Sequence, residues 1–283
     1  DGPDAQACEI LPAALAPLGK EYVRMLEHGL DPRNGWIDVY PSNDKDSGAF
    51  SASVYGRHPY VKMNYQDTLD DLSTLAHEYG HALHSHLSMD NQPYHDHRYV
   101  MFLAEIASTC NEALLSDYLV KKADSQAARI GILAAQLETI RSTIYRQTLF
   151  SEFERLVHGF VEQGTPVTAA LLDETYAGLI KRYYGPGFTL GPNDGMEWAY
   201  IPHFYYKYYV YSYATGLSCG IAIAENVKAK GQPAVDGYLD MLSSGCAEPP
   251  LDLLKKAGVD LTKPDAITAA LARFDRIVTE LAT

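Results

Sequence analysis

The sequence predicts a mainly α-helical domain with a small β-sheet near its N-terminus. From Thr68 onward, apolar residues recur at helical spacing in nearly every segment. Residues 36–65 instead hold short aromatic and β-branched stretches separated by Pro, Gly, Asn and Asp, a pattern typical of strands and turns. No repeat, low-complexity tract or linker interrupts the 283 residues. We therefore expect a single domain over residues 1–283.

The N-terminal half is expected to place three helices around the sheet. Ala, Leu and Tyr follow helical spacing through residues 5–30. A second helix is predicted over about 68–88, with acidic residues in its first turn, where they interact favourably with the helix dipole. A third is predicted over about 98–122, after a short polar loop that lets the two helices run side by side.

The C-terminal half is also predicted to be helical. The stretch from about Ser125 to Gln163 is long enough for one long helix or a broken pair. The next helix starts at Thr165-Pro166 and stops at Gly185, and a loop rich in Gly, Pro and Asn follows it. A tyrosine-rich helix is expected over about 198–228, with two further helical segments after it.

Composition and charge exclude several classes of protein. The net charge of −13 argues against nucleic acid or an anionic membrane as the main partner. No run of 18 apolar residues is present, so no membrane-spanning helix is expected. The four cysteines lie far apart and form no CxxC pair, which favours reduced thiols in the cytoplasm over a disulfide framework.

Six of the ten histidines lie between His77 and His97, and this window contains the motif HEYGH. Residues four apart share a helix face, so His77 and His81 can bind one Zn²⁺ together. Glu78, beside the first histidine, is then placed to take a proton from the activated water and return it to a leaving amine. The motif predicts a zinc-dependent hydrolase, whereas the structural alternative is a surface helix with unrelated histidines.

A catalytic zinc site usually has three protein ligands and one water, so a third ligand must come from another element. Glu105 is the candidate, because a carboxylate in the apolar stretch FLAEIAS is costly to bury unless it is paired or bound to metal. The alternative is a Glu at the edge of an apolar face. Glu112, seven residues later on the same face, either accepts a hydrogen bond from a ligating imidazole or is solvated.

The remaining histidines of the window are expected to have structural or surface roles. His84 shares the helix face of the two predicted ligands; it either supports a ligand or, as we expect, is packed or hydrogen-bonded. His86, His95 and His97 are expected on the surface or in loops.

Together these segments resemble the oligoendopeptidase F branch of the thimet-oligopeptidase-like zinc metallopeptidases. The resemblance starts from HEYGHALH, followed by AEIASTCNEALL about two dozen residues later. It extends over nearly the whole chain, through the segments ALAPLGKEY, WIDVYP, SGAFSASVY, HPYVKMNYQDTLDDLSTLAHE, IYRQTLFSEFE, EWAYIPHFYYKYYVYSYATG and LKKAGVDLT.

The resemblance implies a helical, zincin-type catalytic domain that hydrolyses short, unstructured peptides in the cytoplasm. Carried over by motif, it implies His77, His81 and Glu105 as zinc ligands and Glu78 as the general base, the residues that spacing already indicated. One departure is Asp46 in KDSGA, which adds negative charge near the expected substrate edge and is expected to shift side-chain preference.

Seven of the 21 tyrosines lie between Tyr200 and Tyr213. Neutral His or Tyr donors suit a developing oxyanion, and tyrosine rings pack flat against peptide backbone. We expect His203 to contact the substrate or the oxyanion, while core packing is the alternative for each tyrosine. The lesser candidates are Tyr205, Tyr209 and Tyr211. Four glycines in the preceding loop would permit a mobile segment over the site: Gly185, Gly187, Gly191 and Gly195.

The predicted function is zinc-dependent endopeptidase activity on short peptides, by metal-activated water with Glu78 as base. No cysteine is paired with a histidine at a helix start, which argues against a covalent acyl-enzyme formed on a cysteine. One alternative is a zinc carboxypeptidase or dipeptidase, in which a basic residue such as Arg146 holds the terminal carboxylate. The other is a non-catalytic, zinc-stabilised peptide-binding fragment.

The length of the chain bears on its partners. Members of the resembled family are about twice as long, with an N-terminal helical half, and this sequence has no initiator Met. We therefore expect a C-terminal catalytic half with an apolar face, which packs against a missing N-terminal half or self-associates.

Overall fold

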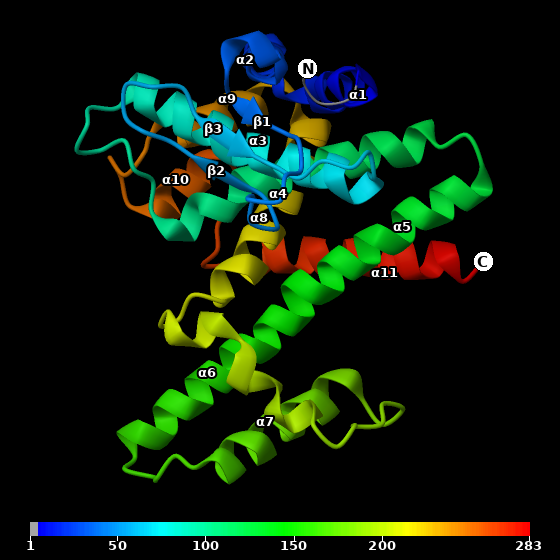
Figure 1. Ribbon diagram of the computed structural model, residues 1–283, viewed down its shortest axis with the longest axis vertical. Helices are drawn as coiled ribbons and strands as arrows, with labels where there is room; N and C mark the ends of the chain where they lie inside the picture. Colours follow the sequence, from blue (N-terminus) through cyan, green and yellow to red (C-terminus); the bar gives the residue numbers. More distant parts are fainter. Residues whose placement is uncertain (1–4) are drawn as a thin grey trace. The chain divides into compact units, whose positions relative to one another are not determined.

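The computed structural model describes residues 5–283, which are predominantly helical with one small three-stranded sheet (Figure 1). The chain divides into two compact units. The described part of unit 1 comprises residues 5–137 and 216–283, and unit 2 comprises residues 138–215. A single domain over residues 1–283 remains a prediction, which this division into two units does not test.

Unit 1 begins with two helices where the sequence predicts one. Helix α1 spans Ala5–Leu15 and α2 spans Lys20–Leu30, with a short 3-10 turn between them. Pro17 lacks the N–H that a continuing helix requires, and Gly19 has a φ of +91°, which residues with a side chain rarely adopt. These two residues break the predicted helix.

The predicted sheet lies within residues 36–65, as expected. Its strands are β1 (Ile37–Asp38), β2 (Phe50–Ala52) and β3 (Tyr60–Lys62). Strand β3 is central: it pairs in parallel with β1, where Ile37 is opposite Val61, and antiparallel with β2, where Ser51 is opposite Val61. Strand β2 is therefore a free edge of the sheet.

The two helices predicted to carry the metal ligands are confirmed as helices. Helix α3 spans Leu69–Asn91 and α4 spans Met101–Lys122, within three residues of the predicted bounds. Their backbones approach closely at Gly80, where an added Cβ would lie 2.4 Å from Ser108 Cα. Only glycine permits this contact, which brings one helix directly against the other.

The remaining helices of unit 1 include α11, which carries a buried arginine. They comprise the unit 1 parts of α5 (Gln126–Ile140) and α8 (Tyr211–Lys230), and α9 (Gln232–Ser243), α10 (Pro250–Lys256) and α11 (Asp265–Leu281). The side chain of Arg273 on α11 is 7% exposed. Its Nη2 donates to Asp117 Oδ1 at 2.7 Å and to Gln136 Oε1 at 2.9 Å, which ties α11 to α4 and α5.

Unit 2 is a helical hairpin covered by 3-10 turns. A π-helical turn, Arg141–Tyr145, runs directly into α6 (Arg146–Glu162), and α7 (Ala169–Tyr184) follows. Two 3-10 segments, η4 (Asp194–Tyr200) and η5 (Pro202–Tyr205), precede the start of α8. Its core consists of buried apolar and aromatic side chains: Leu149, Phe150, Phe153, Tyr176, Leu179, Ile180, Ile201 and Val210.

The prediction of one tyrosine-rich helix over 198–228 is wrong for its first half. Helix α8 begins only at Tyr211. Pro202 has no backbone N–H to continue a helix, and Lys207 and Tyr208 have φ of +53° and +49°, outside the right-handed helical region.

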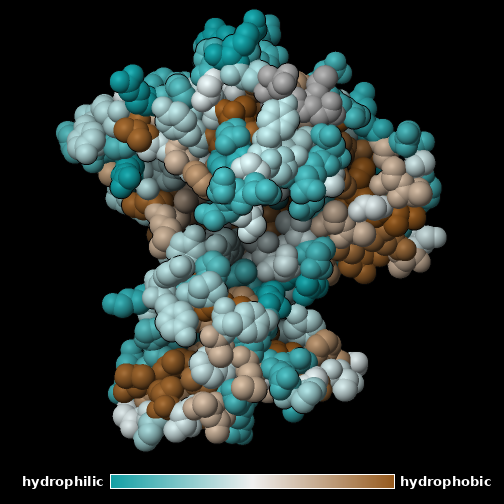
Figure 2. Space-filling model, viewed as in Figure 1, coloured by the Kyte–Doolittle hydropathy of each residue, from teal (hydrophilic) through white to brown (hydrophobic). Residues whose placement is uncertain are grey.

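Apolar surface gathers over α5 and α11 in unit 1 (Figure 2). An ion pair of 2.6 Å between Arg129 and Glu280 joins these two helices. Nearby apolar side chains on them are exposed: Ile130, Ile267 and Val278. Among residues 5–283, no helix combines the length and apolar character needed to cross a bilayer.

Candidate active site

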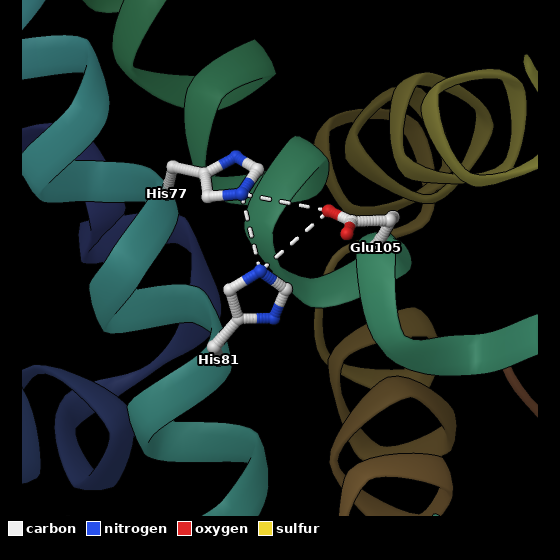
Figure 3. Close-up of side chains that lie close together, drawn as sticks. All are labelled: His77, His81 and Glu105. Atoms are coloured by element: carbon white, nitrogen blue, oxygen red, sulfur yellow. Dashed lines mark hydrogen bonds and ion pairs between the residues drawn. The ribbon is translucent and has the colours of Figure 1, made fainter. Parts of the chain in front are cut away.

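Three side chains from two helices of unit 1 converge on one point (Figure 3). His77 and His81 lie one turn apart on α3, and Glu105 projects from α4. The two histidine Nε2 atoms are 3.1 Å apart, and Glu105 Oε2 lies 3.5 Å from each of them. The structure thus brings together the three predicted metal ligands.

The spacing of these atoms fits a small tetrahedral cation. Zinc bonds of about 2.0–2.2 Å in tetrahedral geometry require donor atoms about 3.3 Å apart. The three separations here are 3.1, 3.5 and 3.5 Å. Within residues 5–283, this is the one group of three His, Cys, Asp or Glu side chains arranged to hold a metal. Two imidazoles and a carboxylate are also a typical catalytic zinc donor set.

Close backbone packing positions the third ligand. An added Cβ on Gly216 of α8 would lie 2.7 Å from Glu105 Cβ, so glycine is needed for α8 to pass this close to the ligand. Thr109 Oγ1 donates to Gly216 O at 3.1 Å and fixes the same crossing. Glu105 is therefore held between α3 on one side and α8 on the other.

Glu112 contacts a ligand rather than solvent alone. Glu112 follows Glu105 on α4. Its Oε1 lies 2.5 Å from His77 Nδ1. Burial alone would lower the pKa of His77, but the hydrogen bond and charge of Glu112, helped by Glu105 and Glu78, raise it to about 9. This contact leaves His77 Nε2 directed toward the other two donor atoms (Figure 3).

Glu78 is buried, and one of its carboxylate oxygens has no hydrogen-bond partner among the described residues. The residue is 6% exposed, and that oxygen is Oε2. Burial raises its pKa to about 7; the His77 charge opposes this rise, and the carboxylates of Glu105 and Glu112 add to it. A carboxyl group that titrates near neutrality beside a metal site is suited to exchange protons with water.

The other histidines of the window have packing or surface roles. His84 is fully buried and stacks on Tyr99 with ring centroids 3.6 Å apart, and neither ring nitrogen has a hydrogen-bond partner among the described residues. It is packed, as expected. His86 lies edge-on to Trp36 at 5.1 Å, and His95 is exposed.

In unit 2, aromatic rings surround His203. Its Nε2 lies 3.2 Å from the Tyr213 hydroxyl, and its ring centroid lies 5.8 Å from Tyr209 and 5.9 Å from Tyr206. We call His203, Tyr206, Tyr209 and Tyr213 the His203 cluster.

The cluster agrees only partly with the predicted candidates. His203 and Tyr209 are in it, but the described ring contacts of His203 include neither Tyr205, which is 74% exposed, nor Tyr211. Tyr213 was not among the predicted candidates, and the segment was expected to form one helix over about 198–228. Pro202 was the signal that this assumption was unsafe.

Arg146 already has an acidic partner within unit 2. Its Nη2 pairs with Glu197, and its guanidinium lies 4.9 Å from the centroid of the Phe150 ring. Tyr176 donates its hydroxyl to the other oxygen of Glu197 at 2.5 Å. These side chains line a cavity of about 680 Å³. Arg146 therefore forms an ion pair with an acid of its own unit.

Comparison with known proteins identifies the family to which the chain belongs. The model of peptidase family M3 matches residues 19–273. Oligopeptidase PepF of Bacillus subtilis is 45% identical over 98% of this chain and 41% of its own length. An oligoendopeptidase F homologue of Borreliella burgdorferi is 41% identical over 95% of this chain and 45% of its own length. The chain thus spans less than half the length of these relatives.

A solved structure shows the same fold. The crystal structure of oligoendopeptidase F from Enterococcus faecium aligns with 99% of this chain and 43% of its own, with a TM-score of 0.74 and 33% identity. The mainly helical architecture with a small N-terminal sheet is therefore confirmed. With a family model matching most of its length and relatives above 40% identity, the chain belongs to peptidase family M3.

Proposed function

We propose that this chain holds the catalytic site of a zinc-dependent endopeptidase acting on short, unstructured peptides. The convergence of His77, His81 and Glu105 at tetrahedral spacing is the observation that carries the proposal. The names of the relatives, oligopeptidase and oligoendopeptidase, support peptide hydrolysis as the reaction and oligopeptides as the substrates.

Glu78 is proposed as the general base and acid. Zinc bound by the three ligands would supply a Lewis acid that lowers the pKa of water and polarises a peptide carbonyl. The Glu78 carboxylate takes the proton from the attacking water, and the protonated form then gives it to the departing amine. Burial raises its pKa, so the carboxyl group can accept a proton and also release it.

The His203 cluster is proposed as a peptide-binding group. Tyrosine rings present a flat apolar face to peptide backbone, and hydroxyls and a neutral imidazole donate hydrogen bonds to carbonyl oxygens. The contact between His203 and Tyr213 fixes one ring against the other, so the donors are oriented before a substrate arrives. Tyr209, which also contacts His203, is the proposed tyrosine among the original candidates.

The apolar surface over α5 and α11 is proposed to face another polypeptide. The chain spans less than half of its relatives, so the remainder of a longer protein is the proposed partner, and a second copy is the alternative. Sedimentation of the purified chain distinguishes them: a dimer supports self-association, and a monomer that binds a separately produced N-terminal half of a relative supports the first reading.

Metal analysis combined with peptide cleavage tests the function. Elemental analysis is expected to find one zinc per chain, and a quenched fluorescent peptide blocked at both ends is expected to be cleaved until a chelator is added. A carboxypeptidase would require a free C-terminus and leave the blocked peptide intact. A non-catalytic module would bind zinc and cleave neither the blocked peptide nor one with a free C-terminus. The pairing of Arg146 with Glu197 removes the basic residue considered for a carboxypeptidase.

A further inference from the structure

Two consecutive residues of the tyrosine-rich segment have an unfavourable backbone conformation. Lys207 and Tyr208 have φ of +53° and +49°. Residues with a side chain rarely adopt this left-handed region, and two in succession must be held by their surroundings. The pair lies between His203 and Tyr209, so it determines how these two members of the His203 cluster face each other.

A buried carboxyl group holds this turn. Glu154 on α6 is 4% exposed, and its Oε1 accepts a hydrogen bond of 2.5 Å from the backbone N–H of Tyr208. Its Oε2 is buried without a hydrogen-bond partner among the described residues, and none of their Lys, Arg or His side chains forms an ion pair with it. Such burial is costly, so the contact with Tyr208 is the interaction that accounts for an acid at this position.

Helix α6 also makes aromatic contacts with the tyrosine-rich segment on both sides of this hydrogen bond. One turn after Glu154, the His158 ring stacks on Tyr208 with centroids 4.5 Å apart. One residue before it, the Phe153 ring packs on Phe204 with centroids 5.2 Å apart. The left-handed turn is thus fixed against α6 by a central hydrogen bond with an aromatic contact on either side.

We propose that Glu154 is a positioning residue for peptide binding. By accepting the Tyr208 N–H, it stabilises the left-handed turn that brings His203, Tyr209 and Tyr213 together. This proposal rests on the peptide-binding role proposed above for the cluster. Glu154 itself touches neither the substrate nor the metal ligands in this scheme, and it acts through the backbone.

Three variants test the role of the Glu154 carboxylate as hydrogen-bond acceptor. Glu154→Ala removes it, and kcat/KM for the end-blocked peptide is expected to fall by about 10- to 100-fold, as small misplacements of binding groups do. Glu154→Gln keeps an acceptor oxygen of the same reach, so it is expected to stay within a few-fold of wild type. Glu152→Gln makes the same change on α6 where the partner is Arg182, and it is the matched control.

Glycine at the turn provides a rescue that a merely structural role would not predict. Lys207→Gly lets the backbone adopt a positive φ without strain. Added to Glu154→Ala, it is expected to recover a substantial part of kcat/KM. Zinc content is measured for every variant, because an unchanged value shows that the loss does not come from the metal site.

A spectroscopic readout separates this proposal from the proposed function. In protein labelled with ¹³C-histidine, the His203 ring signal, assigned with His203→Ala, should shift in Glu154→Ala and return toward wild type in Glu154→Gln. If the wild-type chain cleaves no peptide, the peptidase proposal fails while the shift still decides the role of Glu154. The positioning role is overturned if Glu154→Ala leaves both the signal and kcat/KM unchanged, or if Glu154→Gln is as impaired as Glu154→Ala.

Discussion

His77 Nδ1 lies 2.5 Å from Glu112 Oε1, so the ring of a predicted metal ligand is held by a carboxylate one helix away. In the neutral ring that can bind a metal, Nδ1–H donates to Glu112, and the lone pair of Nε2 then faces His81 and Glu105. A carboxylate that orients a ligating imidazole in this way also increases its basicity. The contact with Glu112 thus orients the His77 ring before any cation binds.

Substitution of Glu112 is therefore expected to weaken metal binding without unfolding the chain. Glu112→Gln removes the charge and is expected to lower zinc affinity by about 10- to 100-fold. Competition with a chromophoric chelator measures the affinity, and circular dichroism checks the fold. Equal zinc affinity in the variant and the wild type would show that Glu112 is only a solvated neighbour.

Glu78→Gln should separate metal binding from turnover. The amide cannot accept the proton of water, and general acid–base catalysis by one group contributes about 10² to 10⁴-fold. We expect kcat to fall by this range while one zinc per chain is retained. Metal content and cleavage of the quenched peptide are measured on the same sample, and full activity would remove Glu78 from the proposed role.

Gly80→Ala is expected to disrupt both stability and metal binding. The new Cβ would lie 2.4 Å from Ser108 Cα and 2.6 Å from Ser108 N, so α3 and α4 must separate. Overpacking against backbone costs about 1–3 kcal/mol, and the shift would move two ligands away from the third. Thermal unfolding and zinc content measure the two effects.

Gly131→Ala is the matched control for Gly80→Ala. It lies in α5, where an added Cβ would have no neighbour within 4 Å. Alanine is the better helix former by about 1 kcal/mol, so this variant should be as stable as wild type or more so. A similar loss of stability in both variants would contradict the role of the close helix contact.

The start of the metal-binding helix gives a stability prediction that depends on pH. Thr68 and Asp71 form a capping box at the N-terminus of α3. Partial burial opposes ionisation of Asp71, but hydrogen bonds from the Thr68 hydroxyl and from the N–H groups of Thr68 and Gln66 lower its pKa. Thr68→Ala is expected to reduce the free energy of unfolding by about 1 kcal/mol at neutral pH.

The sign of the pH effect follows from the lowered pKa of Asp71. Its contribution is fully present above the pKa of an unfolded aspartate, about 3.9, and is lost as the pH falls through the lower folded value. Urea unfolding of wild type and Asp71→Asn should therefore show a difference at pH 7 that shrinks below about pH 4. A difference that grows on acidification would exclude this account.

The sequence allowed the metal ligands to be predicted because their pattern is local. Spacing of four on a helix brings His77 and His81 together, and Glu105 was conspicuous as an acid in an apolar stretch. Glu112 could not be decided, because solvent exposure and contact with a histidine on another helix depend on how α3 and α4 cross. That crossing depends on Gly80, whose role is visible only in three dimensions.

The unit 2 residues were harder to predict for a different reason. Helical periodicity continues formally through the tyrosines, but the backbone leaves the helix at Pro202 and turns at Lys207 and Tyr208. The Tyr213 hydroxyl therefore contacts His203. In one continuous helix, the spacing of ten residues would have directed these two side chains to different faces. Glu154, which holds this turn, is 54 residues distant from Tyr208 in sequence, and no local pattern indicates such a contact.

The direct contact of the α3 and α4 backbones at Gly80 has a consequence for ion choice. Because no side chain separates the two backbones, His77 and His81 on α3 and Glu105 on α4 can bring their donor atoms to 3.1–3.5 Å of one another. Ca²⁺ binds six to eight oxygens at about 2.3–2.6 Å, whereas this site offers two nitrogen donors and one carboxylate. The absence of a side chain at Gly80 thus allows a donor set whose chemistry suits zinc better than calcium.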